Sequence, residues 1–150
     1  SLRRVEVTGG KLEPTFRPHV IGDLAEFSVE DQQWRCSRTD HPVETMGLRV
    51  DAGGRSLGYT ADTGPAWSLA ELGPVDLGLS EATFLHDSPE RNPVHLSAHQ
   101  AGAMARAAGV GHLVITHVLP TGSPEESVVE AADAYGAPVD VATLHRTFDV

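Results

Sequence analysis

The stretch S-A-H-Q-A-G-A-M-A-R-A-A-G-V-G-H-L-V-I-T-H, residues 97–117, combines the clearest helix and the clearest buried strand of the chain. Ser97 and Gln100 form a capping-box pattern at its start, and Gly109 is expected to end the helix. The run L-V-I-T then predicts a buried strand that ends at His117. Apolar side chains at helical spacing are expected in the core, namely Ala101, Met104, Ala105 and Ala108. A helix that leads into a buried strand indicates an α/β fold.

The rest of the chain divides into a strand-rich front and a back in which helices and strands alternate. Short β-branched or alternating runs predict strands over 3–8, 26–29, 33–38, 45–51 and 56–60. The sequence D-A-G-G-R predicts a hairpin turn between the last two of these strands. Later elements are expected over 67–72 (short helix), 75–79 (strand), 123–136 (helix) and 139–144 (strand). We therefore predict one mixed α/β layer in a single domain over residues 1–150.

Composition and charge narrow the possible functions. The chain has 150 residues, of which 40% are hydrophobic and 21% are charged, as in ordinary globular proteins. Its formal net charge of −10 argues against wrapping of long nucleic acid, because such binding depends on Lys and Arg. No apolar run approaches the roughly 18 residues of a membrane span. Cys36 is the one cysteine, and it is expected to be a buried apolar residue of a cytoplasmic protein.

Three side chains with metal-binding chemistry lie at the ends of extended runs. His41 precedes P-V-E-T-M-G-L-R-V, Asp62 follows S-L-G-Y-T-A, and His117 follows H-L-V-I-T. Imidazole and carboxylate are ligands that zinc prefers, and three protein ligands suffice for one catalytic zinc with an open position. Each residue also has an ordinary alternative: a loop histidine before proline, an aspartate of an Asx-turn, and a strand-end histidine bonded to the backbone.

Five pieces of sequence occur in an order that resembles a known family. They are T-D-H-P-V-E-T-M-G-L-R-V, L-G-Y-T-A-D-T-G, V-D-L-G-L-S-E-A-T-F, H-L-S-A-H-Q-A-G-A-M-A-R-A-A-G-V and H-L-V-I-T-H-V, which together cover about residues 39–118. In this order they resemble the C-terminal half of a metallo-β-lactamase-fold hydrolase of the ribonuclease Z and phosphodiesterase branch. The resemblance implies an αββα sandwich, of which this chain would form the C-terminal half to two-thirds as a mixed sheet with helices.

The resemblance also implies roles for five residues. His41 is similar to a ligand of one metal ion, Asp62 to the aspartate that bridges two ions, and His117 to a ligand of the second ion. His95, which opens H-L-S-A, is similar to a catalytic histidine that assists at the scissile phosphate. Glu81 in E-A-T-F is similar to an acid that orients its neighbours. From the residues alone, His95 is equally a helix-entry residue and Glu81 a strand-end carboxylate. Two zinc ions are implied for a complete site, with manganese or iron as alternatives.

One family motif has no counterpart in this sequence. The motif H-x-H-x-D-H, which supplies most of the metal ligands, does not occur among the 150 residues. A complete domain of the family needs roughly another hundred residues in front. We therefore expect Ser1 to be a processing or numbering boundary rather than a natural start. The remaining ligands would then come from a complementary N-terminal half.

The resemblance predicts a metal-dependent hydrolase, and the acidic charge favours a small phosphodiester substrate such as a cyclic nucleotide. One alternative is 3′ processing of transfer RNA, in which the substrate is an RNA 3′ end. Another is a non-catalytic, incomplete module whose exposed apolar sheet face pairs with a partner chain. As protein partners we expect a second copy in a homodimer or a complementary N-terminal half. Hydrolysis of thioesters or lactones is a further alternative, because the same ions polarise carbonyl groups.

Overall fold

A seven-stranded sheet organises the protein in the computed structural model, which describes residues 19–150. The strands lie side by side in sequence order. Neighbours from β1 to β4 are antiparallel, and neighbours from β4 to β7 are parallel. The strand bounds are Glu26–Val29 (β1), Gln32–Arg38 (β2), Met46–Ala52 (β3), Arg55–Tyr59 (β4), Leu77–Glu81 (β5), His112–Thr116 (β6) and Val139–Val141 (β7). The strand predicted over residues 3–8 lies outside the described residues.

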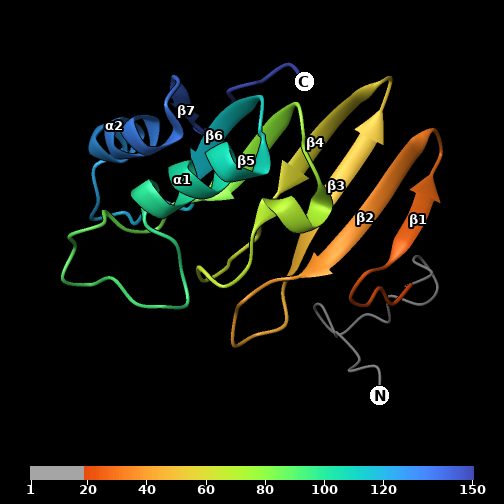
Figure 1. Cartoon of the computed structure of the whole chain (residues 1–150), viewed down its shortest axis with the longest axis horizontal. Helices are drawn as coiled ribbons and strands as arrows, with labels where there is room; N and C mark the ends of the chain where they lie inside the picture. Colours follow the sequence, from red (N-terminus) through yellow and green to blue (C-terminus); the bar gives the residue numbers. More distant parts are fainter. Residues whose placement is uncertain (1–18) are drawn as a thin grey trace, which may run out of the picture.

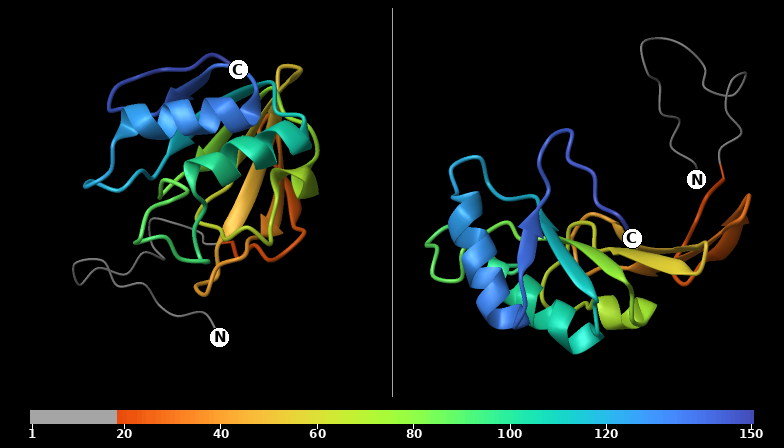
Figure 2. Two further views of the ribbon diagram at one scale, coloured as in Figure 1. Left: turned by 60° about the vertical axis from the view of Figure 1, so that its left-hand side comes forward. Right: turned by 90° about the horizontal axis from the view of Figure 1, so that it is seen from above.

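The helices cover one face of this sheet (Figures 1 and 2). Helix α1, Ala98–Ala108, connects β5 to β6, and helix α2, Pro124–Tyr135, connects β6 to β7. A short 3-10 helix, η1, spans Leu69–Leu72 between β4 and β5. In the view from above, the helices follow one side of a curved sheet and the C-terminal segment lies on the other side. Within residues 19–150, no helix is long and apolar enough to cross a membrane.

Both long helices begin and end at the residues that the sequence indicates. The Ser97 hydroxyl accepts a hydrogen bond from the Gln100 amide, and the Gln100 side chain accepts one from the Ser97 amide. Gly109 then ends α1 in the left-handed conformation, with φ +70°. The second helix has Ser123 as its N-cap, a proline in its first turn and Gly136 in the left-handed conformation at its end. Local capping chemistry therefore fixes the length of both helices.

Three predicted elements differ from those observed by two residues or more. The helix predicted over 67–72 is the shorter η1, which is capped by the Ser68 side chain. The strand predicted over 75–79 is β5, shifted by two residues; the chain bends at Asp76, whose carboxylate accepts hydrogen bonds from the amide and hydroxyl of Ser56. The last strand is shorter than 139–144, since the Ala142 amide makes the last hydrogen bond to β6 and the chain then turns between Thr143 and Arg146.

The hydrophobic core lies between the sheet and the helices. Leu113 and Ile115 of β6 are fully buried there, as are the predicted alanines Ala101 and Ala105 of α1. Met104 is only partly buried at the margin of this core. Cys36 is buried, as predicted, but on the other side of the sheet from this cluster.

The two helices approach most closely at Gly102. A Cβ atom added at Gly102 would lie 2.2 Å from the carbonyl oxygen of Ala131 in α2. We expect Gly102→Ala to lower the free energy of unfolding by about 1–3 kcal/mol, although alanine has the higher helix propensity. Urea denaturation measures the change, and Gly22→Ala is the control because Gly22 has open space around its Cβ position. A variant as stable as the parent would show that the helices separate at no cost.

No helix among residues 19–150 covers the other face of the sheet, which is apolar and is called the open sheet face below (Figure 2). A cavity of about 340 Å³ lies on it. It is lined by Trp34, Leu48, Val50, Leu57, Tyr59, Leu79 and Thr116. Such a face is what one half of a two-layer sandwich presents, because each layer buries its inner face against the other.

Candidate metal centre

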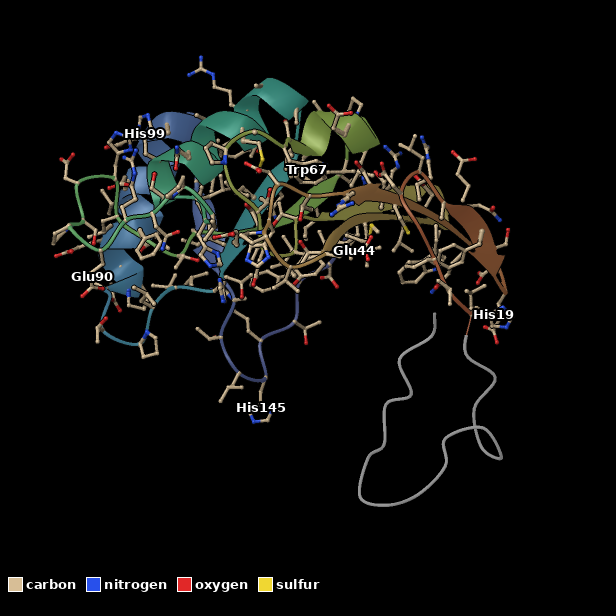
Figure 3. The ribbon with its side chains drawn as sticks, turned by 90° about the horizontal axis from the view of Figure 1, so that it is seen from below. His19, Glu44, Trp67, Glu90, His99 and His145 are labelled. Carbon is tan, nitrogen blue, oxygen red and sulfur yellow. The ribbon has the colours of Figure 1, made fainter. Side chains whose placement is uncertain are left out.

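Four strands deliver the predicted site residues to one edge of the sheet. Strands β2, β4, β5 and β6 run in the same direction, so their carboxyl ends meet at the lower edge in Figure 1. His41 lies in the connection after β2, Asp62 follows β4, Glu81 ends β5, and His117 follows β6. This is the edge at which open α/β sheets bind ligands. Figure 3 views the molecule toward this edge, where Glu44 marks the β2–β3 connection.

The structure brings all five predicted residues together. The ring centroid of His95 lies 5.4 Å from that of His41 and 5.3 Å from that of His117. Asp62, Glu81, His95 and His117 each offer one possible ligand atom, and these four atoms lie within 4.8 Å of one another. His41 is outside this tighter set and joins the cluster through the His95 ring. Three imidazoles and two carboxylates thus form one group, called the sheet-edge cluster below.

Glu81 is the buried centre of the sheet-edge cluster, with 1% of its surface exposed. Its Oε1 accepts hydrogen bonds from the Thr63 amide at 2.7 Å and from His95 Nδ1 at 2.9 Å. Its Oε2 accepts from the Thr83 hydroxyl at 2.7 Å and from the Leu96 amide at 3.1 Å. A carboxylate has about four acceptor positions, and here all four are filled. The geometry suits Glu81 to orient its neighbours rather than to bind a metal.

The hydrogen bonds of the cluster determine which nitrogen of each histidine carries a proton. Because the Thr83 hydroxyl donates to Glu81, its oxygen accepts from His117 Nδ1, 2.8 Å away. His95 Nδ1 donates to Glu81, and His41 Nδ1 donates to a main-chain carbonyl oxygen at 3.1 Å. In each neutral ring the lone pair is therefore on Nε2. This pattern, in which Nδ1–H is held by an acceptor, is typical of histidines that bind metal through Nε2.

The turn A-D-T-G is held through the main chain of Asp62 and not through its carboxylate. Hydroxyl groups of Thr39 and Thr45 donate to the main-chain carbonyl of Asp62 at 2.8 and 3.2 Å, which fixes the backbone. A Cβ atom at Gly64 would lie 2.3 Å from the Pro93 carbonyl oxygen, so the turn needs glycine there to approach the loop before α1. Among residues 19–150, no hydrogen bond reaches the Asp62 carboxylate, which is therefore available to a ligand.

Backbone strain accompanies this arrangement. His117 has φ +58° and Ala61, directly before Asp62, has φ +51°. Residues other than glycine rarely adopt this left-handed conformation, which costs of order 1 kcal/mol or more unless the surroundings stabilise it. Both residues follow strands directly, in the turns that carry Asp62 and His117 of the sheet-edge cluster. Strain of this kind is common at functional sites.

Tyr59, the last residue of β4, responds to the charge of the cluster. Burial raises the pKa of its phenol, and the negative charges of Asp62 and Glu81 raise it further. The phenol therefore remains protonated well above neutral pH. A cation bound in the cluster would offset these negative charges and lower the phenol pKa again.

Two threonines take part in the site although the sequence did not single them out. The Thr83 hydroxyl links Glu81 to His117, and the Thr63 amide binds Glu81 from the turn after β4. Both threonines are buried. Their position within the motifs A-D-T-G and E-A-T-F was the available signal, since each follows a predicted site residue by one or two positions.

The donor set of the cluster fits a divalent metal ion. Two Nε2 lone pairs, from His41 and His117, and the free carboxylate of Asp62 are the ligand types of zinc sites. His95 offers a third Nε2. Together, the fold and the site describe an α/β protein with an imidazole–carboxylate cluster at a sheet edge.

Comparisons with known proteins give the family. Residues 3–118 match the beta-lactamase superfamily domain. An uncharacterised protein of Mycobacterium tuberculosis is 42% identical over 113 residues, which cover 73% of this chain and 41% of that protein. Ribonuclease Z of Haloarcula marismortui is 35% identical over 117 residues, which cover 72% of this chain and 38% of that enzyme. The metallo-beta-lactamase fold protein YhfI from Bacillus subtilis superposes with a TM-score of 0.74 at 24% identity, over 83% of this chain and 52% of that structure.

The chain belongs to the beta-lactamase superfamily and has the metallo-beta-lactamase fold. The predicted family and the predicted mixed sheet with helices are both confirmed. The chain spans about two-fifths of the length of the curated relatives described above.

Proposed function

We propose that the complete protein containing this chain is a metal-dependent hydrolase of small phosphodiesters, such as cyclic nucleotides. The observation that carries the proposal is the orientation of the three histidines. His41, His95 and His117 each bind an acceptor through Nδ1 and keep Nε2 available at one sheet edge. The free carboxylate of Asp62 lies beside them, with Oδ1 3.7 Å from His117 Nδ1.

His41, Asp62 and His117 would hold the metal, and zinc is the ion we propose, with manganese or iron as alternatives. Bound zinc supplies Lewis acidity, which lowers the pKa of water and withdraws charge from a phosphoryl oxygen. The motif H-x-H-x-D-H does not occur in this sequence. We therefore propose that the other ligands of a two-metal site come from outside these 150 residues.

His95 is proposed as the catalytic side chain of this chain. Its ring lies between those of His41 and His117, and its Nδ1 proton is held by the buried carboxylate of Glu81. A carboxylate in this position fixes the imidazole orientation and stabilises its protonated form. Nε2 is the free nitrogen of this ring, and in the protonated imidazole it would donate a proton to a phosphoryl or leaving-group oxygen.

A prediction follows for the complete, zinc-loaded protein with bis-p-nitrophenyl phosphate as substrate. We expect His95→Ala to lower kcat by about 10²- to 10⁴-fold, the usual contribution of a positioned acid or base, with the metal content unchanged. His112→Ala is the control, because His112 begins β6, at the opposite edge of the sheet from His117. Equal turnover of His95→Ala and parent, at equal metal content, would refute the role of His95.

Transfer-RNA 3′ processing is the second candidate, favoured by the similarity to ribonuclease Z of Haloarcula marismortui. The net charge of −10 is the reason to prefer a small substrate, since RNA binding depends on basic side chains. Hydrolysis of a cyclic mononucleotide and of a precursor transfer RNA by the same preparation separates the two candidates. Faster cleavage of the RNA by about tenfold or more in kcat/KM would reverse the preference.

A third candidate is a non-catalytic module, and the open sheet face favours it. The apolar cavity of about 340 Å³ on that face is suited to pair with a complementary N-terminal half or with a second copy. Zinc titration of the isolated chain tests this candidate. No binding at micromolar zinc, by the chain alone or with its partner half, would support the module over the hydrolase.

A further inference from the structure

A second cavity opens directly beside His95. Its volume is about 210 Å³, and it lies between the turn after Asp62, the loop before α1 and the first turn of α1. It is lined by Pro65, Arg91, Asn92, Pro93, His95 and Gln100. None of these residues is acidic, which distinguishes the cavity from the rest of a strongly acidic chain. The larger cavity nearby, by contrast, is lined in part by Glu90 and Glu126.

The two amide side chains line this cavity, and within residues 19–150 no hydrogen bond engages their NH₂ groups. The Gln100 Oε1 atom accepts a hydrogen bond from the Ser97 amide at 2.9 Å. The Asn92 Oδ1 atom accepts one from the Val94 amide at 3.1 Å. Because main-chain donors use both side-chain oxygens, each orientation is fixed and the NH₂ groups remain as donors.

Arg91 adds a positive charge to these donors. Its Nη1 donates to the carbonyl oxygen of His86 at 2.9 Å, which anchors the guanidinium to the loop. Within residues 19–150, no hydrogen bond engages Nε or Nη2, so one side of the guanidinium is available to a ligand. A planar guanidinium flanked by amide donors matches the oxygen atoms of a phosphate group.

We propose that Arg91, Asn92 and Gln100 bind a second phosphate group of the substrate while the scissile phosphodiester lies at His95. This inference rests on the proposed function, and within that substrate class it favours phosphodiesters with at least two phosphates, such as linear or cyclic dinucleotides, over cyclic mononucleotides. His95 belongs both to the lining of this cavity and to the sheet-edge cluster, so the two phosphate positions are adjacent. The cavity thereby selects the substrate without taking part in the chemical step.

Binding of two non-hydrolysed probes tests the pocket independently of turnover. Isothermal titration of the complete protein, with zinc and after its removal by EDTA, compares adenosine 3′,5′-bisphosphate with adenosine 3′-monophosphate. We expect the bisphosphate to bind at least about tenfold more tightly, as a charge-assisted contact implies. Arg91→Gln is expected to reduce this affinity ratio to about one. Arg106→Gln, at the exposed far end of α1, is the control and is expected to keep the parent ratio.

Steady-state kinetics provide a second test of the pocket. In Arg91→Gln, kcat/KM for a linear dinucleotide with a 5′-phosphate is expected to fall about tenfold relative to kcat/KM for bis-p-nitrophenyl phosphate. An unchanged affinity ratio in Arg91→Gln overturns the pocket. A preparation that loses the ratio in Arg91→Gln but hydrolyses no phosphodiester supports the pocket and contradicts the proposed function instead.

Discussion

Asp62→Asn is expected to weaken zinc binding by more than about 100-fold, beyond the loss usually seen for partners that only support a ligand. The substitution keeps the shape of the side chain and removes its negative charge. That charge lies beside His117, with Oδ1 3.7 Å from Nδ1, and no group among residues 19–150 donates a hydrogen bond to it. Hydrolysis of bis-p-nitrophenyl phosphate by the complete protein is expected to fall by at least the same factor. A competition titration with a chromophoric chelator measures the affinity.

The same variant is expected to fold as well as the parent. Loss of a carboxylate that makes no hydrogen bond, and that lies near the buried Glu81, changes the unfolding free energy by no more than about 0.5 kcal/mol. Asp133→Asn, on the exposed surface of α2, is the matched control for charge and is expected to keep full zinc affinity. Parent-like zinc affinity in Asp62→Asn would remove this aspartate from the metal centre.

Local signals in the sequence were sufficient for the helices and for the position of the strand ends. The Ser97 capping box and the two terminal glycines define α1 and α2 to within a residue. The hairpin sequence D-A-G-G-R pairs β3 with β4, with both glycines at positive φ. These features depend on neighbours within four or five residues, so a single sequence contains them.

Contacts between distant segments determine the features that the sequence alone did not predict. The bend before β5 is anchored by the hydrogen bond from the Ser56 hydroxyl to Asp76, twenty residues apart in the chain. The role of Thr83 depends on His117, thirty-four residues away, because the Thr83 hydroxyl oxygen accepts a hydrogen bond from His117 Nδ1. Family resemblance supplied the roles of single residues, whereas the network that joins them was visible only in three dimensions.

The open sheet face and the sheet-edge cluster meet at Tyr59. This residue lines the apolar cavity on the open face, and its phenol also responds to the charges of Asp62 and Glu81. A complementary half that covers the face would therefore bury Tyr59 and reach the sheet-edge cluster at the same time. Docking and completion of the metal centre would then be coupled through one side chain.

The hydrogen bonds of Glu81 make it the residue whose loss affects both folding and the site. Glutamine has one oxygen acceptor and one NH₂ donor, and so it cannot accept from four donors. If the glutamine oxygen still accepts from Thr63 and His95, its NH₂ group faces the Leu96 amide, so that two donors meet. The Thr83 hydroxyl must then accept from the NH₂ group instead of donating to a carboxylate. Thr83 then donates to His117 Nδ1, which places the imidazole proton on Nε2 and removes the lone pair proposed for the metal.

Glu81→Gln is therefore expected to lower the free energy of unfolding by about 3 kcal/mol, because a buried main-chain donor is left unpaired and a charged acceptor is lost. Zinc affinity is expected to fall by about 10–100-fold, as for other groups that orient a metal-binding histidine. Urea denaturation of the metal-free protein and chelator competition measure the two effects separately. Glu71→Gln, an exposed acid of η1, is the control. If Glu81→Gln lost stability but kept zinc affinity, Thr83 would not set the proton on His117, and the carboxylate would serve the fold alone.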